Sequence, residues 1–131
     1  MASGAAIVRA GGAMKAKDAL GVMGESLACD HLTEIGYTII DRNWRCEFGE
    51  IDIVARQGST LIVCEVKTRS SLRLGDPVEA VSARKVRRLR RLALCWLEAH
   101  SIHAPHIRID VIGILRRPDG PTSLRHLTGV E

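Results

Sequence analysis

The sequence has few of the features that mark zinc proteins or membrane proteins. No apolar run is long enough to cross a bilayer, and no repeat or low-complexity tract is present. The four cysteines are widely spaced and lack the close pairs of zinc sites: Cys29, Cys46, Cys64 and Cys95. These absences argue against a structural zinc site and a membrane span. They favour reduced thiols in a cytoplasmic protein.

The beginning of the chain also has little that a targeting segment requires. It is small and weakly apolar, and Arg9 and Gly11-Gly12 interrupt any continuous hydrophobic stretch, so it makes a poor signal peptide. We expect residues 1–16 to be a disordered leader. The remainder, residues 17–131, is of the size of one domain with a substantial core.

Lysine is scarce among the cationic residues. Of the 19 Lys and Arg residues, four are lysine and fifteen are arginine, and the net charge is +4. Arginine suits phosphate recognition because its planar fork of donors is fixed in geometry. A bias in genomic base composition explains the same excess equally well, so composition alone leaves the partner open.

Periodicity and turn residues predict one mixed α/β arrangement. The second helix starts at the capping sequence Asp76-Pro77-Val78-Glu79, and it crosses over between two strands that we expect to be parallel. The expected elements are a helix over 17–35 ended by Gly36, strands over 38–44, 50–55 and 60–67, a helix over 76–100, a strand over 106–115 and a short edge strand over 122–127.

Two acids and an amine are expected to meet on one face of the second and third strands. Side chains alternate along a strand, so Glu65 and Lys67 project to the same side. A hairpin turn centred on residues 57–58 places Asp52 opposite Val63, with Glu65 its diagonal neighbour at roughly 7 to 8 Å. A shift of one residue would put the acids on opposite faces. With the acids together, the group can hold a divalent cation and activate water.

Each helix carries a polar residue of unusual placement. Glu25 borders the apolar stripe of the first helix, where a solvated flank is the simplest reading. Lys85 lies within the apolar stripe of the second helix, between Val81 and Leu89. Its amine either extends to the protein's edge or reaches a cluster of carboxylates or a phosphate that compensates its desolvation.

Cations gather on the other faces of the second helix. They repel one another and have no acid among them, so the run is either a solvated surface or a site for a nucleic-acid backbone: Arg84, Arg87, Arg88, Arg90 and Arg91. Asn43 and Arg45 precede a turn and either contact phosphate or close that loop.

Other titratable residues receive structural assignments. We expect Asp110 and Arg108 to form a local ion pair at the edge of the sheet rather than a metal site. The histidines show no metal-ligand spacing and are assigned to the surface: His31, His100, His103, His106 and His126.

Taken in order, these blocks resemble the YraN family of small endonuclease-like proteins. That family lies within the PD-(D/E)xK nuclease superfamily, which includes restriction enzymes and archaeal Holliday-junction resolvases. The residues that carry the resemblance are Gly24-Glu25, Asp41-Arg42-Asn43-Trp44-Arg45, Gly49-Glu50-Ile51-Asp52-Ile53-Val54, Glu65-Val66-Lys67-Thr68-Arg69, Gly75-Asp76-Pro77 and Lys85. Ile51 stands where the superfamily's name has proline.

The resemblance implies an α/β, restriction-endonuclease-like core (α-β-β-β-α-β), a mixed sheet with helices on both faces. It further implies a phosphodiesterase site dependent on Mg²⁺ or Mn²⁺. Asp52, Glu65 and Glu25 would be the metal ligands, and Lys67 would position or activate the water. Nucleic acid would be contacted by Lys85, Arg84, Arg88, Arg91, Asn43, Arg45 and Arg69.

The expected function is therefore a metal-dependent endonuclease acting on DNA, including branched or structured DNA. One alternative is a nucleic-acid-binding module that keeps the nuclease shape without turnover. Another is a scaffold domain with an incidental polar cluster. Resolvase-like relatives suggest a homodimer by analogy.

Overall fold

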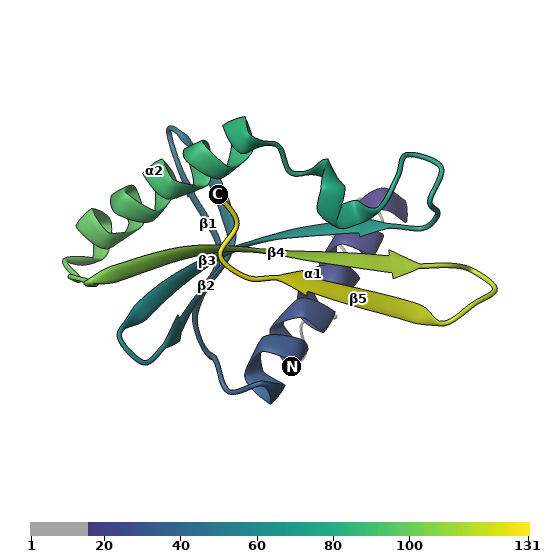
Figure 1. The fold of residues 1–131 in the computed structure, drawn as a ribbon, viewed down its shortest axis with the longest axis horizontal. Helices are drawn as coiled ribbons and strands as arrows, with labels where there is room; N and C mark the ends of the chain where they lie inside the picture. Colours follow the sequence, from purple (N-terminus) through teal and green to yellow (C-terminus); the bar gives the residue numbers. More distant parts are fainter. Residues whose placement is uncertain (1–15) are drawn as a thin grey trace, which may run out of the picture.

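The computed structural model describes residues 16–131, in which helices flank a five-stranded sheet (Figure 1). The predicted leader lies outside the described residues apart from Ala16, which begins the first helix. Among residues 16–131, no helix has the length and apolarity of a membrane span. The elements are α1 (Ala16–Glu34), β1 (Thr38–Cys46), β2 (Gly49–Gln57), β3 (Thr60–Arg69), η2 (Pro77–Ala80), α2 (Ala83–His100), β4 (His106–Arg116) and β5 (Thr122–Leu127).

The sheet has the strand order β1-β2-β3-β4-β5, with every neighbouring pair antiparallel except β3 and β4. Parallel neighbours need a long connection, which the segment containing η2 and α2 provides. The predicted parallel pair and the predicted edge strand over 122–127 are both confirmed. The α-β-β-β-α-β core is confirmed with them.

The helix α1 covers one face of the sheet. Ala28 and Leu32 pack there against Ile53, Ile62 and Ile112, all of them fully buried. Gly36 follows the helix with φ of +98°, the left-handed conformation in which glycine commonly ends helices. This packing anchors α1 beside the middle strands.

The helix α2 covers the opposite face (Figure 1). Leu89 and Trp96 are fully buried against Val54, Val63 and Ile109. The two central strands β3 and β4 therefore carry apolar side chains on both faces, as the sequence predicted for the fourth strand.

The predicted helix over 76–100 is wrong in one respect, because it is broken near its start. Asp76 accepts a hydrogen bond from the Val78 N–H at 3.0 Å, but the short 3₁₀ turn η2 ends at Ala80, and the backbone of the following Val81 is extended. Ser82 then caps α2 by accepting the Lys85 N–H at 3.2 Å. The apolar Val81 continued the helical spacing and concealed this second cap.

Gly24 marks a close approach of α1 to the sheet. A Cβ at Gly24 would lie 1.8 Å from Thr68 Oγ1 and 2.9 Å from Thr68 Cβ, whereas one at Gly21 meets nothing within 4 Å. We therefore expect Gly24→Ala to destabilise the protein by about 1 to 3 kcal/mol through overpacking. Gly21→Ala on the same helix should stabilise it by up to about 1 kcal/mol. Urea denaturation of both variants measures the difference, and equal effects would contradict the close packing.

Candidate active site

The hairpin between β2 and β3 brings two acids together, although its register differs from the prediction. Gln57 pairs with Thr60, so the turn is Gly58-Ser59 and not residues 57–58. The pairing runs as far as Ile53 and Cys64, beyond which the next residues are Asp52 and Glu65. Asp52 was predicted opposite Val63, and this is wrong by two residues. A shift of two preserves the face of every side chain, so the acids remain on the same side.

The carboxylate of Asp52 is tied to the third strand. Its Oδ2 accepts a hydrogen bond from the backbone N–H of Val66 at 2.8 Å, at the point where the regular pairing of β2 and β3 has ended. The bond fixes the side chain beside Glu65 on the neighbouring strand. The orientation of Asp52 is thus set by the backbone and does not depend on a flexible partner.

Glu65 is a buried carboxylate beside two ammonium groups. Its side chain is 6% exposed, and its Oε2 lies 3.9 Å from Lys67 Nζ and 3.5 Å from Lys85 Nζ. Burying a carboxylate is costly unless charge or hydrogen bonds compensate it. Lys67 arrives from the same strand and Lys85 from α2. Of the two alternatives for Lys85, the contact with a carboxylate is the one observed.

These groups border an open hollow of about 370 Å³ between the sheet and α2. Polar surface predominates in it, and its lining combines acids and cations. The residues around it are Gly49, Glu50, Asp52, Glu65, Val66, Lys67, Lys85, Arg88 and Leu92. The hollow has room for a cation with its waters and for a phosphate group.

Asp52 and Glu65 place two carboxylates at the border of the hollow. Burial raises the pKa of Asp52 to about 7, the charge of Glu65 adds to the rise, and the Val66 hydrogen bond acts in the opposite direction. The charge of Glu65 disfavours ionisation of Asp52, and a bound cation would offset that repulsion.

This raised pKa gives a prediction about stability. Because the pKa of Asp52 is higher in the folded than in the unfolded protein, its contribution to stability is present below about pH 4 and is lost as pH rises towards 7. Without metal, the melting temperature should fall over that window, and Asp52→Asn should flatten the fall. Calorimetry across pH in chelator measures both slopes. A wild-type slope that Asp52→Asn leaves unchanged would contradict the assignment.

Glu25 lies near this site but does not line the hollow. It is half-buried on α1, where burial raises its pKa while a hydrogen bond from Asn43 and the charge of Arg42 lower it, and the charge of Glu65 raises it further. Glu25 thus adds negative potential to the acids. The structure places its carboxylate outside the pair that Asp52 and Glu65 form.

The donor set fits a hard dication. Within residues 16–131, no three His, Cys, Asp or Glu side chains gather as a ready-made metal cluster. Mg²⁺ commonly binds through one or two carboxylates, keeps several waters and takes further oxygens from substrate phosphates. Asp52 and Glu65 supply such a pair at the edge of an open polar hollow. The chemistry of the site therefore matches Mg²⁺ or Mn²⁺ better than a cation that needs a full protein cage.

Sequence reasoning missed Glu50, which lines the hollow two residues before Asp52. Its Oε2 accepts a hydrogen bond from Arg45 Nε at 2.8 Å. The alternation of side chains along β2 was the available signal, since residues 50 and 52 share a face. Arg45, predicted to contact phosphate or to close its loop, is engaged by this exposed ion pair.

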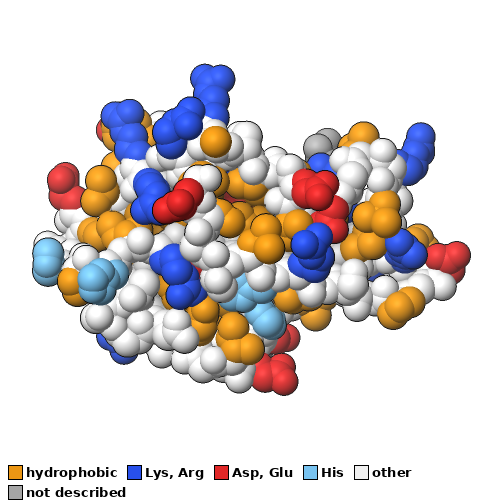
Figure 2. All heavy atoms as spheres, viewed as in Figure 1, with side chains coloured by type: hydrophobic (Ala, Val, Ile, Leu, Met, Phe, Trp, Pro, Cys, Tyr) orange, Lys and Arg blue, Asp and Glu red, His pale blue; other side chains and the backbone are white. Residues whose placement is uncertain are grey.

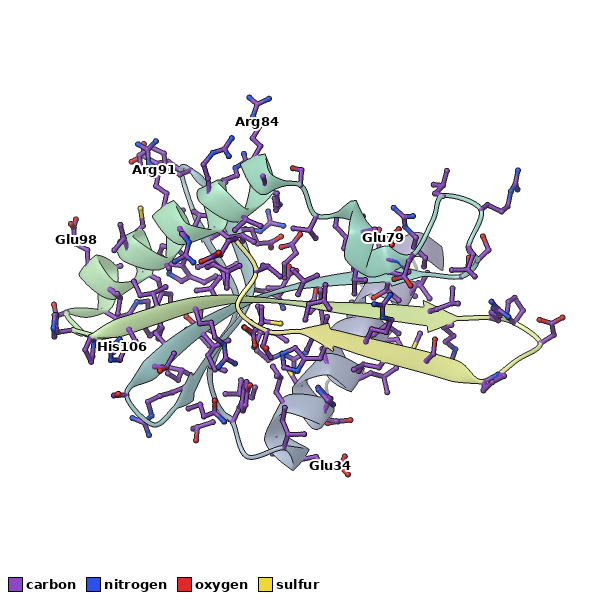
Figure 3. The ribbon with its side chains drawn as sticks, in the orientation of Figure 1. Glu34, Glu79, Arg84, Arg91, Glu98 and His106 are labelled. Carbon is purple, nitrogen blue, oxygen red and sulfur yellow. The ribbon has the colours of Figure 1, made fainter. Side chains whose placement is uncertain are left out.

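The predicted cations of α2 divide into two groups. Lys85 and Arg88 face the hollow. Arg84 and Arg91 extend outward from the helix (Figure 3), and Figure 2 shows Lys and Arg side chains gathered over it. An exposed basic surface thus continues from the hollow along α2.

The remaining predicted contacts have local partners. Arg69 donates to the backbone carbonyl oxygens of Leu74 and Gly75, so it holds the loop after β3. Asn43 is exposed in β1 with φ of +52°, a left-handed conformation that asparagine tolerates better than most residues. The irregular backbone at Asn43 lies beside the strand that carries Asp52.

A second polar cluster lies away from the hollow, where β4 and β5 meet α1. Asp110 is fully buried and accepts from Arg108 Nε at 2.8 Å and Nη2 at 2.9 Å, from His126 Nε2 at 2.7 Å and from the Gly129 N–H at 3.1 Å. The predicted ion pair of Arg108 and Asp110 is confirmed, but Asp110 is fully buried while Arg108 is 27% exposed, so the pair is not simply a feature of the sheet's edge. The assignment of His126 to the surface is wrong, since its side chain is 8% exposed.

His31 extends this cluster from α1, with its Nε2 3.1 Å from His126 Nδ1. Burial lowers the pKa of His31 and the neighbouring His126 lowers it further. Burial alone would raise the pKa of Asp110, yet the hydrogen bonds from His126, Arg108 and Gly129 hold it below its usual value. The cluster joins α1, β4 and β5, which gives it a structural role.

Comparison with known proteins identifies related chains. The model of the uncharacterised protein family UPF0102 matches residues 24–114. A UPF0102 protein of Kineococcus radiotolerans is 50% identical over 119 residues, covering 90% of this chain and 98% of that protein. One of Beutenbergia cavernae is 52% identical over 117 residues, covering 89% and 99%. Among solved structures, Archaeoglobus fulgidus Hjc, a Holliday junction resolvase, is similar with a TM-score of 0.45 and 22% identity over 80% of this chain and 75% of that chain.

Proposed function

The chain belongs to the UPF0102 family, the YraN family that its motifs resembled, and on this premise we propose that it is a metal-dependent endonuclease acting on DNA. One observation carries the proposal. Asp52 and Glu65 converge at an open polar hollow that also holds the ammonium groups of Lys67 and Lys85. Packing of the core does not explain why four charged side chains gather at one place, whereas a functional site does.

In this proposal the two carboxylates hold Mg²⁺ or Mn²⁺. The bound dication supplies Lewis-acid polarisation of the phosphate and lowers the pKa of a bound water. Asp52 is oriented for this role by the Val66 N–H, and Glu65 by its two lysine neighbours. Glu25, the third metal ligand that the resemblance implied, contributes negative potential from outside the hollow and does not bind the cation directly.

The lysines have separate tasks. Lys67 Nζ is partly exposed beside Glu65 and donates a hydrogen bond to the scissile phosphate or to the attacking water. Lys85 Nζ lies closer to Glu65 and compensates its buried charge, and it adds positive potential for a phosphate in the hollow. Arg88, which also lines the hollow, donates hydrogen bonds to the same phosphate.

Substrate binding is assigned to the basic surface that α2 presents. Arg84, Arg88 and Arg91 are exposed along this helix, and arginine neutralises backbone phosphates without reading sequence. The resemblance to the PD-(D/E)xK superfamily favours DNA, including branched or structured DNA, as the partner. Asn43 and Arg45 extend this surface beside the hollow.

The direct test is cleavage of a set of DNA substrates by the purified chain. Single-stranded, duplex, flapped and four-way-junction DNA are incubated with Mg²⁺, with Mn²⁺ and with chelator. We expect cleavage with metal and none in chelator. The absence of cleavage under every condition would remove the proposal.

A binding module without turnover is the second candidate, favoured by one observation. The exposed arginines of α2 do not contact the carboxylates, so binding does not require them. This candidate predicts salt-sensitive DNA binding that survives the loss of Asp52 and Glu65 in a protein that never cleaves. A filter-binding titration beside the cleavage assay separates the two.

The proposal extends to the domain, its location in the cell and the number of copies that act together. Residues 17–131 would act as one domain, in the cytoplasm, and two copies would form a homodimer on a branched substrate. Sedimentation of the chain with and without a four-way junction measures the number of copies bound.

A further inference from the structure

Phe48 is an exposed aromatic ring in a chain whose aromatic content is 3%. It is 44% exposed, whereas Trp96 and Tyr37 are buried in the two cores at 0% and 7%. Phe48 lies in the turn between β1 and β2, where it contributes little to the core. A single exposed apolar residue needs no explanation, but Phe48 is accompanied by Leu94, which is 60% exposed.

The ring of Phe48 is paired with an arginine of α2. The guanidinium carbon of Arg91 lies 4.8 Å from the ring centroid, within the range of a cation–π contact. Aromatic rings and arginine planes are the two kinds of side chain on which proteins stack unpaired bases. The pair joins the hairpin turn to the basic helix.

Phe48 and Arg91 border a second hollow, of about 410 Å³, between α2 and the end of β1 with the turn that follows it. Trp44 and Leu94 contribute apolar surface to it, and Glu47 and Glu98 contribute carboxylates. Carboxylates repel a phosphate but accept hydrogen bonds from the amino groups of bases. This hollow is therefore better suited to a base than to the backbone.

The second hollow adjoins the candidate active site. Gly49 lines the first hollow and follows Phe48 directly; a Cβ on it would lie 3.4 Å from Leu92 Cδ1 and 3.6 Å from Arg88 Nε. These short distances show that the turn lies close to α2, and the φ of +142° is one that glycine adopts readily. Arg88 and Arg91 are three residues apart on the helix and so are neighbours on its surface. A strand with a phosphate at the first hollow has its next bases near the second.

We propose that Phe48 and Arg91 form a stacking site for an unpaired base of the DNA substrate. The inference rests on the proposed function and deepens it by naming the feature that the substrate must offer. A base inside a continuous duplex is already stacked and paired, and it is not available to Phe48. The protein therefore prefers DNA with a flap, mismatch or branch next to the strand that it cleaves.

The test uses Asp52→Asn protein, so that binding is measured without cleavage, and 2-aminopurine as a fluorescent base. One DNA carries it at the first unpaired position of a flap, and the other carries it within a duplex. Phe48→Ala should weaken binding of the flapped DNA by about 5- to 100-fold and remove the fluorescence quenching. Duplex affinity should stay within about twofold. Phe48→Tyr keeps the ring and should retain both properties.

Ile102→Ala is the matched control, because Ile102 is 45% exposed in the loop after α2 and lines neither hollow. It should change neither affinity. Equal effects of Phe48→Ala on flap and duplex, or no effect, would overturn the stacking site, while metal-dependent cleavage by the wild type would leave the function standing. A dimer lost in Phe48→Ala would identify this face as an interface between copies and would also overturn it. Absence of all DNA binding would remove both proposals.

Discussion

Replacing Asp52 with asparagine is expected to reduce metal-dependent DNA cleavage by about 10³-fold or more. The amide keeps an oxygen that can accept the Val66 N–H but loses the charge that holds the dication. Loss of metal assistance is worth several kcal/mol of transition-state stabilisation, at tenfold in rate for about 1.4 kcal/mol. Lys67→Ala should cost about 10²- to 10³-fold, as for other preorganised donors. Single-turnover cleavage rates at saturating protein measure both.

Two comparisons make this result interpretable. Glu79→Gln removes an exposed carboxylate on η2 (Figure 3) that does not line the hollow, and this variant should cleave at the wild-type rate. Asp52→Asn removes a repulsion from Glu65, so above pH 7 its melting temperature in chelator should not fall below that of the wild type. A folded Asp52→Asn variant that cleaves at the wild-type rate would assign the activity to another site or to a contaminant.

Asp110→Ala is expected to destabilise the protein by about 3 to 5 kcal/mol. Asp110 is fully buried and accepts the hydrogen bonds of Arg108, His126 and Gly129. Removing Asp110 leaves the donors of His126 and Gly129 without their acceptor in a buried place and takes the carboxylate partner from Arg108, which costs far more than the net value of the pair. This is a large part of the stability of a small domain. Urea denaturation at neutral pH measures the loss, and Asp110→Asn should show an intermediate value.

Arg125→Ala is the control for this loss. Arg125 is the neighbour of His126 on β5, and its exposed ion pair with Asp76 has a distance of 2.8 Å. Exposed pairs contribute at most about 1 kcal/mol, so this variant should be nearly as stable as the wild type. Comparable losses of unfolding free energy in Asp110→Ala and Arg125→Ala would show that the burial of Asp110 does not determine how much it stabilises the protein.

The sequence predicted that the acids converge because their convergence depends only on which face of the sheet each side chain occupies. Asp52 was placed two residues from its true partner, but an even shift leaves both acids on one side of the sheet. Glu65 and Lys67 share a strand face whatever the turn, and Lys85 stood out as a cation in an apolar stripe. Strong local periodicity thus located most of the groups around the hollow.

Other features depended on contacts between distant parts of the chain. His126 is buried because β5 pairs with β4 and brings it to Asp110, while His31 reaches it from α1, 95 residues away in sequence. No local pattern marks such a contact. The break at Ser82 was hidden for the opposite reason, since Val81 continued the helical spacing while the backbone there is extended.

The central claim is that the carboxylates of Asp52 and Glu65 share one divalent cation, and anomalous diffraction from crystals soaked in Mn²⁺ tests it most directly. We predict one strong anomalous peak bonded to oxygens of both carboxylates, with Lys67 Nζ beside it, and no peak there in Asp52→Asn crystals. Saturating Mn²⁺ with no peak between these two side chains would contradict the account.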